Sequence, residues 1–344
     1  MATQNYSTVA SRNLIRTEMN MLKHAEPIQV LGRFGAHKEQ PRRKTDTVVF
    51  RQLVPFNAGA NEVASITPAS FVTAEGTTPN AQTITYTDVA VTLQQFAVLF
   101  KFSSKAELMY EDDIPADMQK LTGETLAEVA ELICYGQVKA GSTVAYTNGA
   151  TRDAVNTVLS LNSLRSMART LESNRAKRVT SVIKSGPNFG TAPVPAGYVV
   201  FVHTDVESDI RNLPKFTPVE AYGSAVKPVH EREIGACEQF RFVTSPLFTP
   251  YLASGSAVLN GCASTAGARV DVYPVIVIAE DAFGHVSLKG HGYTGISPTL
   301  IPSGVKNHAN PSGMFGYVGA DFWYQSVRLN ENWMGRIESG VTDL

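Results

Sequence analysis

The residue types that could perform chemistry are scattered along this chain and form no recognised catalytic motif. Gly290-His291-Gly292-Tyr293-Thr294-Gly295 matches the glycine string of dinucleotide-binding loops. That fingerprint requires a helix directly after the loop, and Pro298 and Pro302 prevent a helix here. We therefore interpret the string as a glycine-rich loop.

Histidines offer the other candidate chemistry. His285 and His291 stand six residues apart, a spacing that does not predict a metal pair. His203 lies two residues before Asp205. This pair could orient the imidazole for chemistry, but its simpler interpretation is the start of a helix. The sequence also lacks the GxSxG, P-loop and HExxH motifs. It therefore predicts no catalytic, cofactor or metal site, and a protein that is not an enzyme.

The cysteines and the hydropathy restrict the cellular setting. Three cysteines form no CxxC pair, and we expect Cys237 and Cys262 to be small buried apolar groups. No basic segment followed by an apolar stretch opens the chain, so we expect maturation in a reducing cytoplasm. The longest apolar stretch, near Val275 to Ala279, is far shorter than the roughly 20 residues of a membrane helix. We expect no membrane span.

Length and charge favour a subunit of a larger assembly. The 344 residues are enough for two domains or one large one. Charged residues make up 18% of the chain, and 30 basic against 31 acidic side chains leave a net charge of -1. This balance lacks the positive field of a dedicated nucleic-acid binder. A weakly charged, nearly neutral chain suggests a surface covered by other subunits.

The charges are nevertheless segregated along the sequence. Residues 1–51 carry nine basic and four acidic side chains, a net +5, which leaves -6 for the remainder. This basic segment has little apolar periodicity and is typical of an extended arm that contacts something else, or else of a solvated terminus. Residues 52–100 contain no lysine or arginine.

The cation-free segment has the pattern of long β-strands. Apolar residues alternate with period two between positions 84 and 102, with phase slips near Asp88 and Gln94, where we expect bulges. Residues 74–79 carry the turn residues of a hairpin tip. Because a two-stranded hairpin is not stable alone in water, its own domain or a neighbouring subunit must cover it.

A long helix follows. Its apolar stripe has 3.6-residue spacing, Asp113 can cap its start, and Gly141 can stop it, so we predict a helix over residues 114–139. Eight acidic residues and one lysine lie between positions 106 and 131, so its polar face is strongly negative. That face is either a solvated surface or a docking surface.

Further elements alternate without the repeated βαβ period of a doubly wound enzyme. We predict an α+β fold. The expected elements are a short helix at 105–110, a helix at 162–174, strands at 198–203, 240–244 and 270–279, a helix opened by Asp205, and a strand pair within 316–338. The helix at 162–174 has Leu164, Met167, Ala168 and Leu171 on one side, so we expect these residues to be buried.

Several segments in the second half, taken in order, resemble tailed-bacteriophage major capsid proteins of the N-four-like coat family. The similarity is collinear over roughly residues 50–340. The segments are Tyr198–Arg211, Glu233–Thr244, Ala279–Gly284, and Asn310-Pro311 through Trp323 to Leu329–Glu338, preceded by Leu53–Pro55, Glu75–Pro79 and Thr87–Val89.

The resemblance implies the Hong Kong 97 capsid fold. In that fold an N-terminal arm precedes an extended hairpin called the E-loop, a spine helix lies in a peripheral domain, and an axial domain surrounds the local symmetry axes. On this chain it implies an arm (1–50), an E-loop hairpin (51–104), a peripheral domain with the spine helix (105–156), an axial domain (157–300) and a return to the peripheral domain (301–344).

Two departures qualify the resemblance. Some shells of this fold are cross-linked between a lysine on the E-loop and an asparagine of a neighbour, but here Arg51 and Lys101 bracket a cation-free E-loop. We therefore expect a non-covalent shell. Some relatives also carry a long N-terminal scaffolding segment, and with about 50 residues before the E-loop we expect that segment to be missing or already removed here.

The implied function is self-assembly, through pentamers and hexamers, into the icosahedral head shell that encloses double-stranded DNA. Implied partners are other copies of the chain, a portal protein, possible scaffolding or decoration proteins, and DNA bound without specificity; the location is the virion, after assembly in the host cytoplasm. We expect the basic arm to meet acidic patches on neighbours. The candidate inter-subunit residues are Arg12, Arg16, Arg42, Arg43, Lys44, Glu75, Gly76, Glu111, Asp112, Asp113 and Asp117.

Two alternatives stay open. A cellular encapsulin-like nanocompartment shell shares the fold but packages enzymes, so a bound cargo peptide in place of nuclease-protected DNA would favour it. A cytoplasmic enzyme with its active site on the loops around His285 and His291 would form no megadalton particle.

Overall fold

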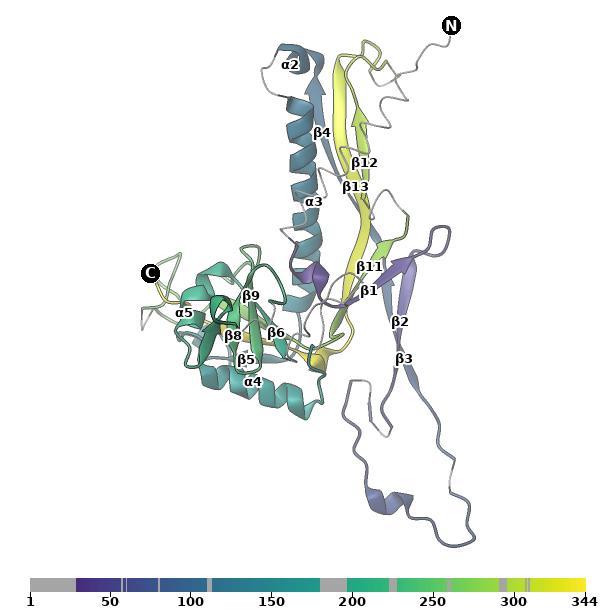
Figure 1. Ribbon diagram of the computed structural model, residues 1–344, viewed down its shortest axis with the longest axis vertical. Coiled ribbons are helices and arrows are strands. Elements are labelled where there is room, and N and C mark those ends of the chain that lie inside the picture. The colour runs from purple at the N-terminus through teal and green to yellow at the C-terminus, as the bar shows by residue number, and fades with distance from the viewer. Residues whose placement is uncertain are drawn as a thin grey trace. The chain divides into compact units, whose positions relative to one another are not determined.

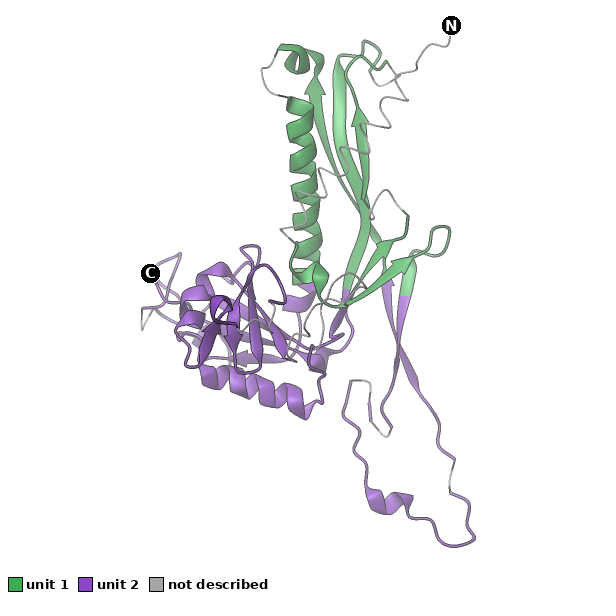
Figure 2. Ribbon diagram, viewed as in Figure 1, with its two compact units in different colours: residues 1–48, 92–135, 285–326 green, residues 49–91, 136–284, 327–344 purple. Residues whose placement is uncertain are grey.

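The computed structural model describes residues 29–344 apart from 57, 60, 80, 110–112, 180–196, 223–227, 259–260, 291–295, 307 and 309. The chain divides into two compact units, each assembled from separate stretches of sequence (Figure 2). Unit 1 comprises residues 1–48, 92–135 and 285–326, and unit 2 comprises residues 49–91, 136–284 and 327–344. In the described part of the chain, no helix is long and apolar enough to cross a membrane.

The sheet of unit 1 is organised around its longest strand, β13 (Phe315–Arg328). The strand β4 (Gln94–Ser103) pairs antiparallel with β13 over ten residues, and β12 (Ile296–Ile301) also pairs antiparallel with β13. The strands β1 (Ala36–Gln40) and β11 (Phe283–Leu288) complete the order β1-β11-β13-β12. Burial alternates along β13, as expected of a strand with one face on a core.

Two helices follow β4, α2 (Ser104–Met109) and α3 (Ile114–Lys139) (Figure 1). The predicted helix over 114–139 is confirmed. The side chain of Asp113 accepts a hydrogen bond from the Ala116 N–H at 3.3 Å, and the Gly141 N–H bonds the Val138 carbonyl at the other end. The apolar stripe buries Leu126, Ala127 and further residues toward Val138.

Unit 2 contains a seven-stranded mixed sheet. Its central strands are buried along their full length, because the sheet is covered on both faces and its apolar runs do not need to alternate. The strands, in spatial order, are β5 (Val144–Tyr146), β14 (Met334–Ser339), β10 (Tyr273–Ile278), β6 (Tyr198–Val202), β9 (Phe240–Thr244), β8 (Glu233–Cys237) and β7 (Phe216–Pro218).

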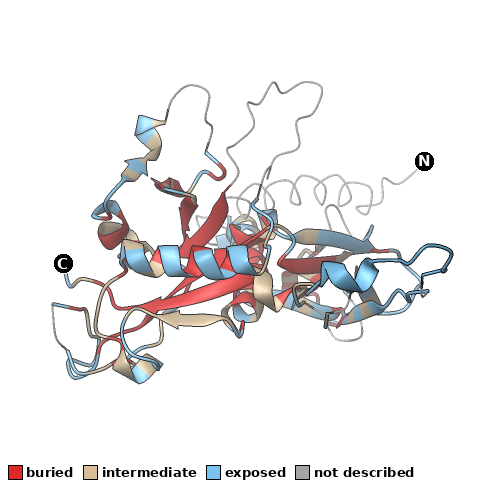
Figure 3. Ribbon diagram, turned by 90° about the horizontal axis from the view of Figure 1, so that it is seen from below, coloured by how far each residue is buried: buried red, intermediate tan, exposed pale blue. Residues whose placement is uncertain are grey.

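The helix α4 (Leu161–Ser173) packs on this sheet through one apolar stripe. The Ser160 side chain caps it by accepting a hydrogen bond from the Ser163 N–H, and its buried residues are the four predicted from spacing: Leu164, Met167, Ala168 and Leu171. Gly335 of β14 permits the close approach, since a Cβ there would lie 2.2 Å from the Met167 sulfur. Figure 3 shows the buried strands and the exposed outer side of α4.

The smaller elements complete the described chain. The helix α5 (Glu207–Arg211) continues from a 3-10 turn, Thr204–Val206. Other 3-10 turns lie at Leu31–Arg33, Pro68–Phe71, Arg152–Ala154, Val219–Ala221 and Glu331–Trp333.

A separate two-stranded sheet joins β2 (Thr47–Leu53) to β3 (Tyr86–Thr92). Here the structure differs from the expected hairpin. The phase slip near Gln94 is the break between β3 and β4, not a bulge, and β4 turns away to pair with β13. The expected strand pair within 316–338 is also wrong, because β13 and β14 belong to different sheets. The segment boundaries implied by the resemblance stay predictions.

Candidate functional site

The most distinctive surface of unit 2 is the hairpin formed by β2, β3 and the loop between them. Its apolar side chains point into water: Val72 is 81% exposed and Ile84 71%. Exposed apolar surface of this extent is a feature of interaction sites. We call these residues the hairpin surface: Leu53, Phe56, Ile66, Phe71, Val72, Ile84 and Tyr86.

The loop tip carries Glu75 and Gly76, both exposed. Its turn is closed by Thr77, whose N–H and hydroxyl both donate to the Ala74 carbonyl, at 3.2 and 2.7 Å. Gly76 adopts φ +78°, a conformation that favours glycine. At the other end of the hairpin, Arg51 holds Asp88 through two hydrogen bonds, of 2.8 and 2.9 Å, which lower the pKa of that carboxyl.

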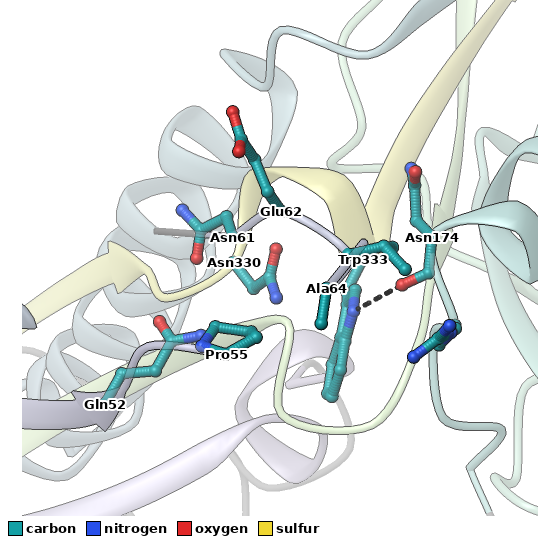
Figure 4. Close-up of a pocket in the computed structure, with 10 residues that line it drawn as sticks. Gln52, Pro55, Asn61, Glu62, Ala64, Asn174, Asn330 and Trp333 are labelled. Carbon is teal, nitrogen blue, oxygen red and sulfur yellow. Dashed lines mark hydrogen bonds between the residues drawn. The ribbon is translucent and has the colours of Figure 1, made fainter. Parts of the chain in front are cut away.

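A pocket of about 140 Å³ lies at the start of this loop, just after β2 (Figure 4). Gln52, Pro55 and Asn61 line one side and Trp333 the other. The Trp333 indole N–H donates to the Asn174 carbonyl at 3.3 Å, and the Asn332 amide donates to the Asn61 carbonyl. The root of the loop is therefore bonded to the segment that leads into β14, while the rest of the loop extends into solvent.

The predicted acidic residues at the start of α3 are exposed where the structure describes them. Asp113 caps the helix, and Asp117 lies 3.7 Å from Lys120 on the next turn. Glu111 and Asp112 lie outside the described residues, as do Arg12 and Arg16 of the arm.

The basic residues Arg42, Arg43 and Lys44 form an exposed turn between β1 and β2. The Gln40 side-chain amide closes the turn by donating to the Thr45 carbonyl at 2.6 Å. Among the residues that the structure describes, no ion pair joins this turn to Asp113 or Asp117. The two charged sets are thus not brought together within one subunit.

A buried carboxylate fastens the start of the described chain to α3. Glu131 accepts the Leu31 N–H at 2.9 and 3.1 Å, with further backbone bonds from Val30 and Gly32. Burial raises the pKa of Glu131 to about 7, against the lowering effect of these N–H groups. Its neighbour Cys134 contacts the Tyr324 hydroxyl at 2.9 Å. Sequence reasoning missed this role, because Glu131 was grouped with the solvated acidic face.

A second buried carboxylate organises the edge of the large sheet. Glu338 is fully buried and binds the Arg152 guanidinium at 2.7 and 2.8 Å and the Arg336 guanidinium at 2.8 Å. Arg152 also stacks 3.5 Å above the Tyr251 ring centre, and Arg336 donates to the Lys139 carbonyl. This cluster is structural: it joins the chain after α3 to the last strand.

The two histidine candidates that the structure describes, His203 and His285, each have a structural contact. His203 accepts the Asp205 N–H at 3.1 Å and so begins the next helix, as predicted. His285 stacks on His37 with 4.9 Å between ring centres, and burial lowers its pKa to about 4. His291 lies outside the described residues. The glycine-rich loop leads into β12, a strand, so the helix required for dinucleotide binding is absent from the segment after it.

The outer side of α4 and the chain just after it form a cationic surface that sequence reasoning missed. The available signal was five basic residues against one acidic residue between 161 and 178. We call this the α4 surface: Arg165, Arg169, Glu172, Arg175, Lys177 and Arg178, together with Lys215 and Glu238.

Comparison with known proteins identifies the fold that carries these surfaces. A curated relative, the major capsid protein of Pseudomonas phage KPP21, is 21% identical over 252 residues, which cover 69% of this chain. The aligned part spans only 62% of that relative's length. A chain from the capsid of Ralstonia phage GP4 superposes with a TM-score of 0.60 at 11% identity, covering 89% of this chain and 87% of the other.

An encapsulin complex from Synechococcus elongatus is also similar, with a TM-score of 0.52 and 11% identity over 92% of this chain and 90% of the other. These likenesses show the Hong Kong 97-type capsid fold, as the sequence resemblance implied. The family described as phage capsid protein matches residues 85–305, which is more than half of the chain. This chain therefore belongs to the phage capsid protein family.

Proposed function

We propose that this chain is a major capsid protein that assembles, without covalent cross-links, into the icosahedral head shell enclosing the double-stranded DNA of a tailed phage. The hairpin surface is the observation that supports this most directly. A two-stranded sheet with exposed apolar side chains is not stable in isolation, so it needs a partner. In a shell built from one kind of subunit, that partner is the next copy.

The charged turn and the acidic start of α3 support the same proposal. Arg42, Arg43 and Lys44 are exposed in unit 1, as are Asp113 and Asp117, and neither set neutralises the other within the described chain. Contacts between copies would satisfy both. Each exposed pair contributes only about 0 to 1 kcal/mol, but a shell repeats it many times. The basic arm predicted at residues 1–50, which includes Arg12 and Arg16, would extend these contacts.

Shell formation is tested by replacing loop residues 62–84, which carry Ile66, Phe71, Val72 and Ile84, with a short Gly-Ser linker. The root bonds of Asn61 and the strands β2 and β3 stay in place, so the subunit itself should fold. We expect the wild-type chain to form closed particles and the variant to stay as free subunits or small oligomers in size-exclusion chromatography. Closed particles from the variant would refute the role of the hairpin.

A nanocompartment shell is the second candidate, because the fold of an encapsulin complex is also similar. The two functions differ in their contents. Nuclease-protected DNA in particles from the native source supports the phage head, whereas a co-purifying enzyme held inside DNA-free particles supports the compartment. The phage-head proposal also includes portal, scaffolding and decoration proteins as partners. It includes assembly in the host cytoplasm as well.

A further inference from the structure

The α4 surface is built on a rigid support. Its buried stripe fixes α4 on the large sheet, so the exposed residues have defined positions. Arg165 binds Glu238 of the β8–β9 turn, and Lys215 binds the same carboxylate at 3.1 Å. These two cations lower the pKa of Glu238 to about 2. The carboxylate stays ionised and holds two cations side by side.

The other half of the surface is arranged around the same turn. Arg178 donates to Glu172 at 2.7 Å and to the side chain of Gln239 at 2.8 Å. Arg169 lies one helical turn after Arg165 on the exposed side of α4. Within the described residues, Arg169, Arg175 and Lys177 have no ion-pair partner.

Positive charge is in excess here. Residues 161–178 hold five basic side chains and one acidic one, a net +4 in a chain whose total is -1. Adding Lys215 and Glu238 leaves this excess unchanged. Glu280 brings one further carboxyl-bearing residue to this segment, since its N–H bonds the Lys177 carbonyl. Counting it still leaves positive charge in excess among the described residues, so the surface can take an anion from outside the subunit.

The chemistry of the surface indicates which anion. Protein interfaces have an apolar centre, but no large hydrophobic residue is exposed among the described residues between Leu132 and Leu252. Exposed Ser166 and Thr170 stand between the arginines instead, and exposed Asn162 precedes them. Arginine, lysine and small hydroxyl or amide side chains are the groups that contact DNA phosphates. The surface thus fits a regular polyanion better than another subunit.

We propose that the α4 surface binds the phosphate backbone of double-stranded DNA. The inference rests on the proposed function, because a shell that encloses DNA is what presents this polyanion to the subunit. Binding is independent of base sequence and strongly dependent on salt, since each neutralised phosphate releases condensed counterions. The acidic face of α3 repels DNA, whereas the excess positive charge of the α4 surface attracts it.

The test uses the full chain as unassembled subunits and a fluorescent 30-base-pair duplex of arbitrary sequence, with affinity measured by anisotropy at several salt concentrations. The variant R169Q/R175Q/K177Q removes three cations that have no ion-pair partner in the described chain. The control K105Q/K289Q/K306Q removes three exposed lysines of unit 1. Size-exclusion chromatography and electron microscopy of each protein report shell assembly separately.

We expect the α4 variant to bind DNA roughly tenfold more weakly or worse, with a salt slope smaller by about 2.7, while the control retains the wild-type slope to within about 1. Equal losses in both variants would show a general charge effect and overturn the proposal. So would an α4 variant that binds DNA normally but no longer assembles, since the surface would then be a subunit interface. A wild-type chain that forms shells without binding DNA contradicts this inference alone; one that binds DNA but forms no shells contradicts the proposed function alone.

Discussion

Substitution E338Q tests whether the buried cluster around Glu338 holds unit 2 together. The carboxylate has no exposed side-chain surface, and it accepts two hydrogen bonds from Arg152 and one from Arg336. The Arg336 side chain is itself only 10% exposed. Glutamine keeps the shape but removes the charge, which leaves two guanidinium groups and the nearby Lys139 without their shared counter-ion. Breaking a buried ion pair in this way costs about 3 to 5 kcal/mol.

The assay is urea unfolding of unassembled subunits, followed by intrinsic fluorescence. With a slope of about 3 kcal/mol per molar, the expected loss lowers the midpoint by about 1 to 1.7 M. The matched control is E172Q, the same substitution in the exposed pair with Arg178, whose expected cost is about 0 to 1 kcal/mol. If E338Q lowers the midpoint no more than E172Q does, the cluster does not contribute as the geometry indicates.

Two further predictions concern cross-linking and pH. Because residues 52–100 contain no lysine, particles boiled in detergent and reductant should run as a single 37.2 kDa band, and a ladder of higher oligomers would contradict the non-covalent shell. The pKa of Glu131 is about 7 in the folded chain, above the ordinary value of 4.5 for a glutamate. The folded state therefore binds this proton more tightly than the unfolded state does. This stabilisation is complete below pH 4.5 and is lost as the pH rises through 7, so the free energy of unfolding should fall by about 3 kcal/mol across that window. E131Q should lack this decrease, and an unchanged pH profile would rule out Glu131 as its source.

Local signals were sufficient to predict the helices. The Asp113 cap, the 3.6-residue stripe and Gly141 give the bounds of α3, and the stripe of α4 gives its four buried residues. These features depend on near neighbours in the sequence, which a pattern records directly.

Strand pairing was harder because alternation indicates a strand but not its partner. The residues of β3 and β4 continue one pattern, yet β3 pairs with β2 and β4 with β13. Likewise β13 and β14 are adjacent in sequence but lie in different sheets. Partner choice depends on long-range packing, which a single sequence does not contain.

The candidate site was predicted in part. The cation-free hairpin was recognised as needing a cover, and the structure describes its apolar side chains as exposed. The roles of Glu131 and Glu338 were not predictable from the sequence, because their partners are distant. Leu31 lies 100 residues from Glu131, and Arg152 lies 186 residues from Glu338. The α4 surface was visible as a run of charges, but only its helix and the β8–β9 turn show that the cations gather on one side.

The central claim is that copies of this chain close into a shell through the hairpin. Electron microscopy of the purified wild-type protein tests it most directly. The proposed function predicts hollow particles of uniform, megadalton size, with averaged images that place each hairpin against a neighbouring subunit. A preparation that holds only folded monomers or small oligomers across a range of protein and salt concentrations would contradict it.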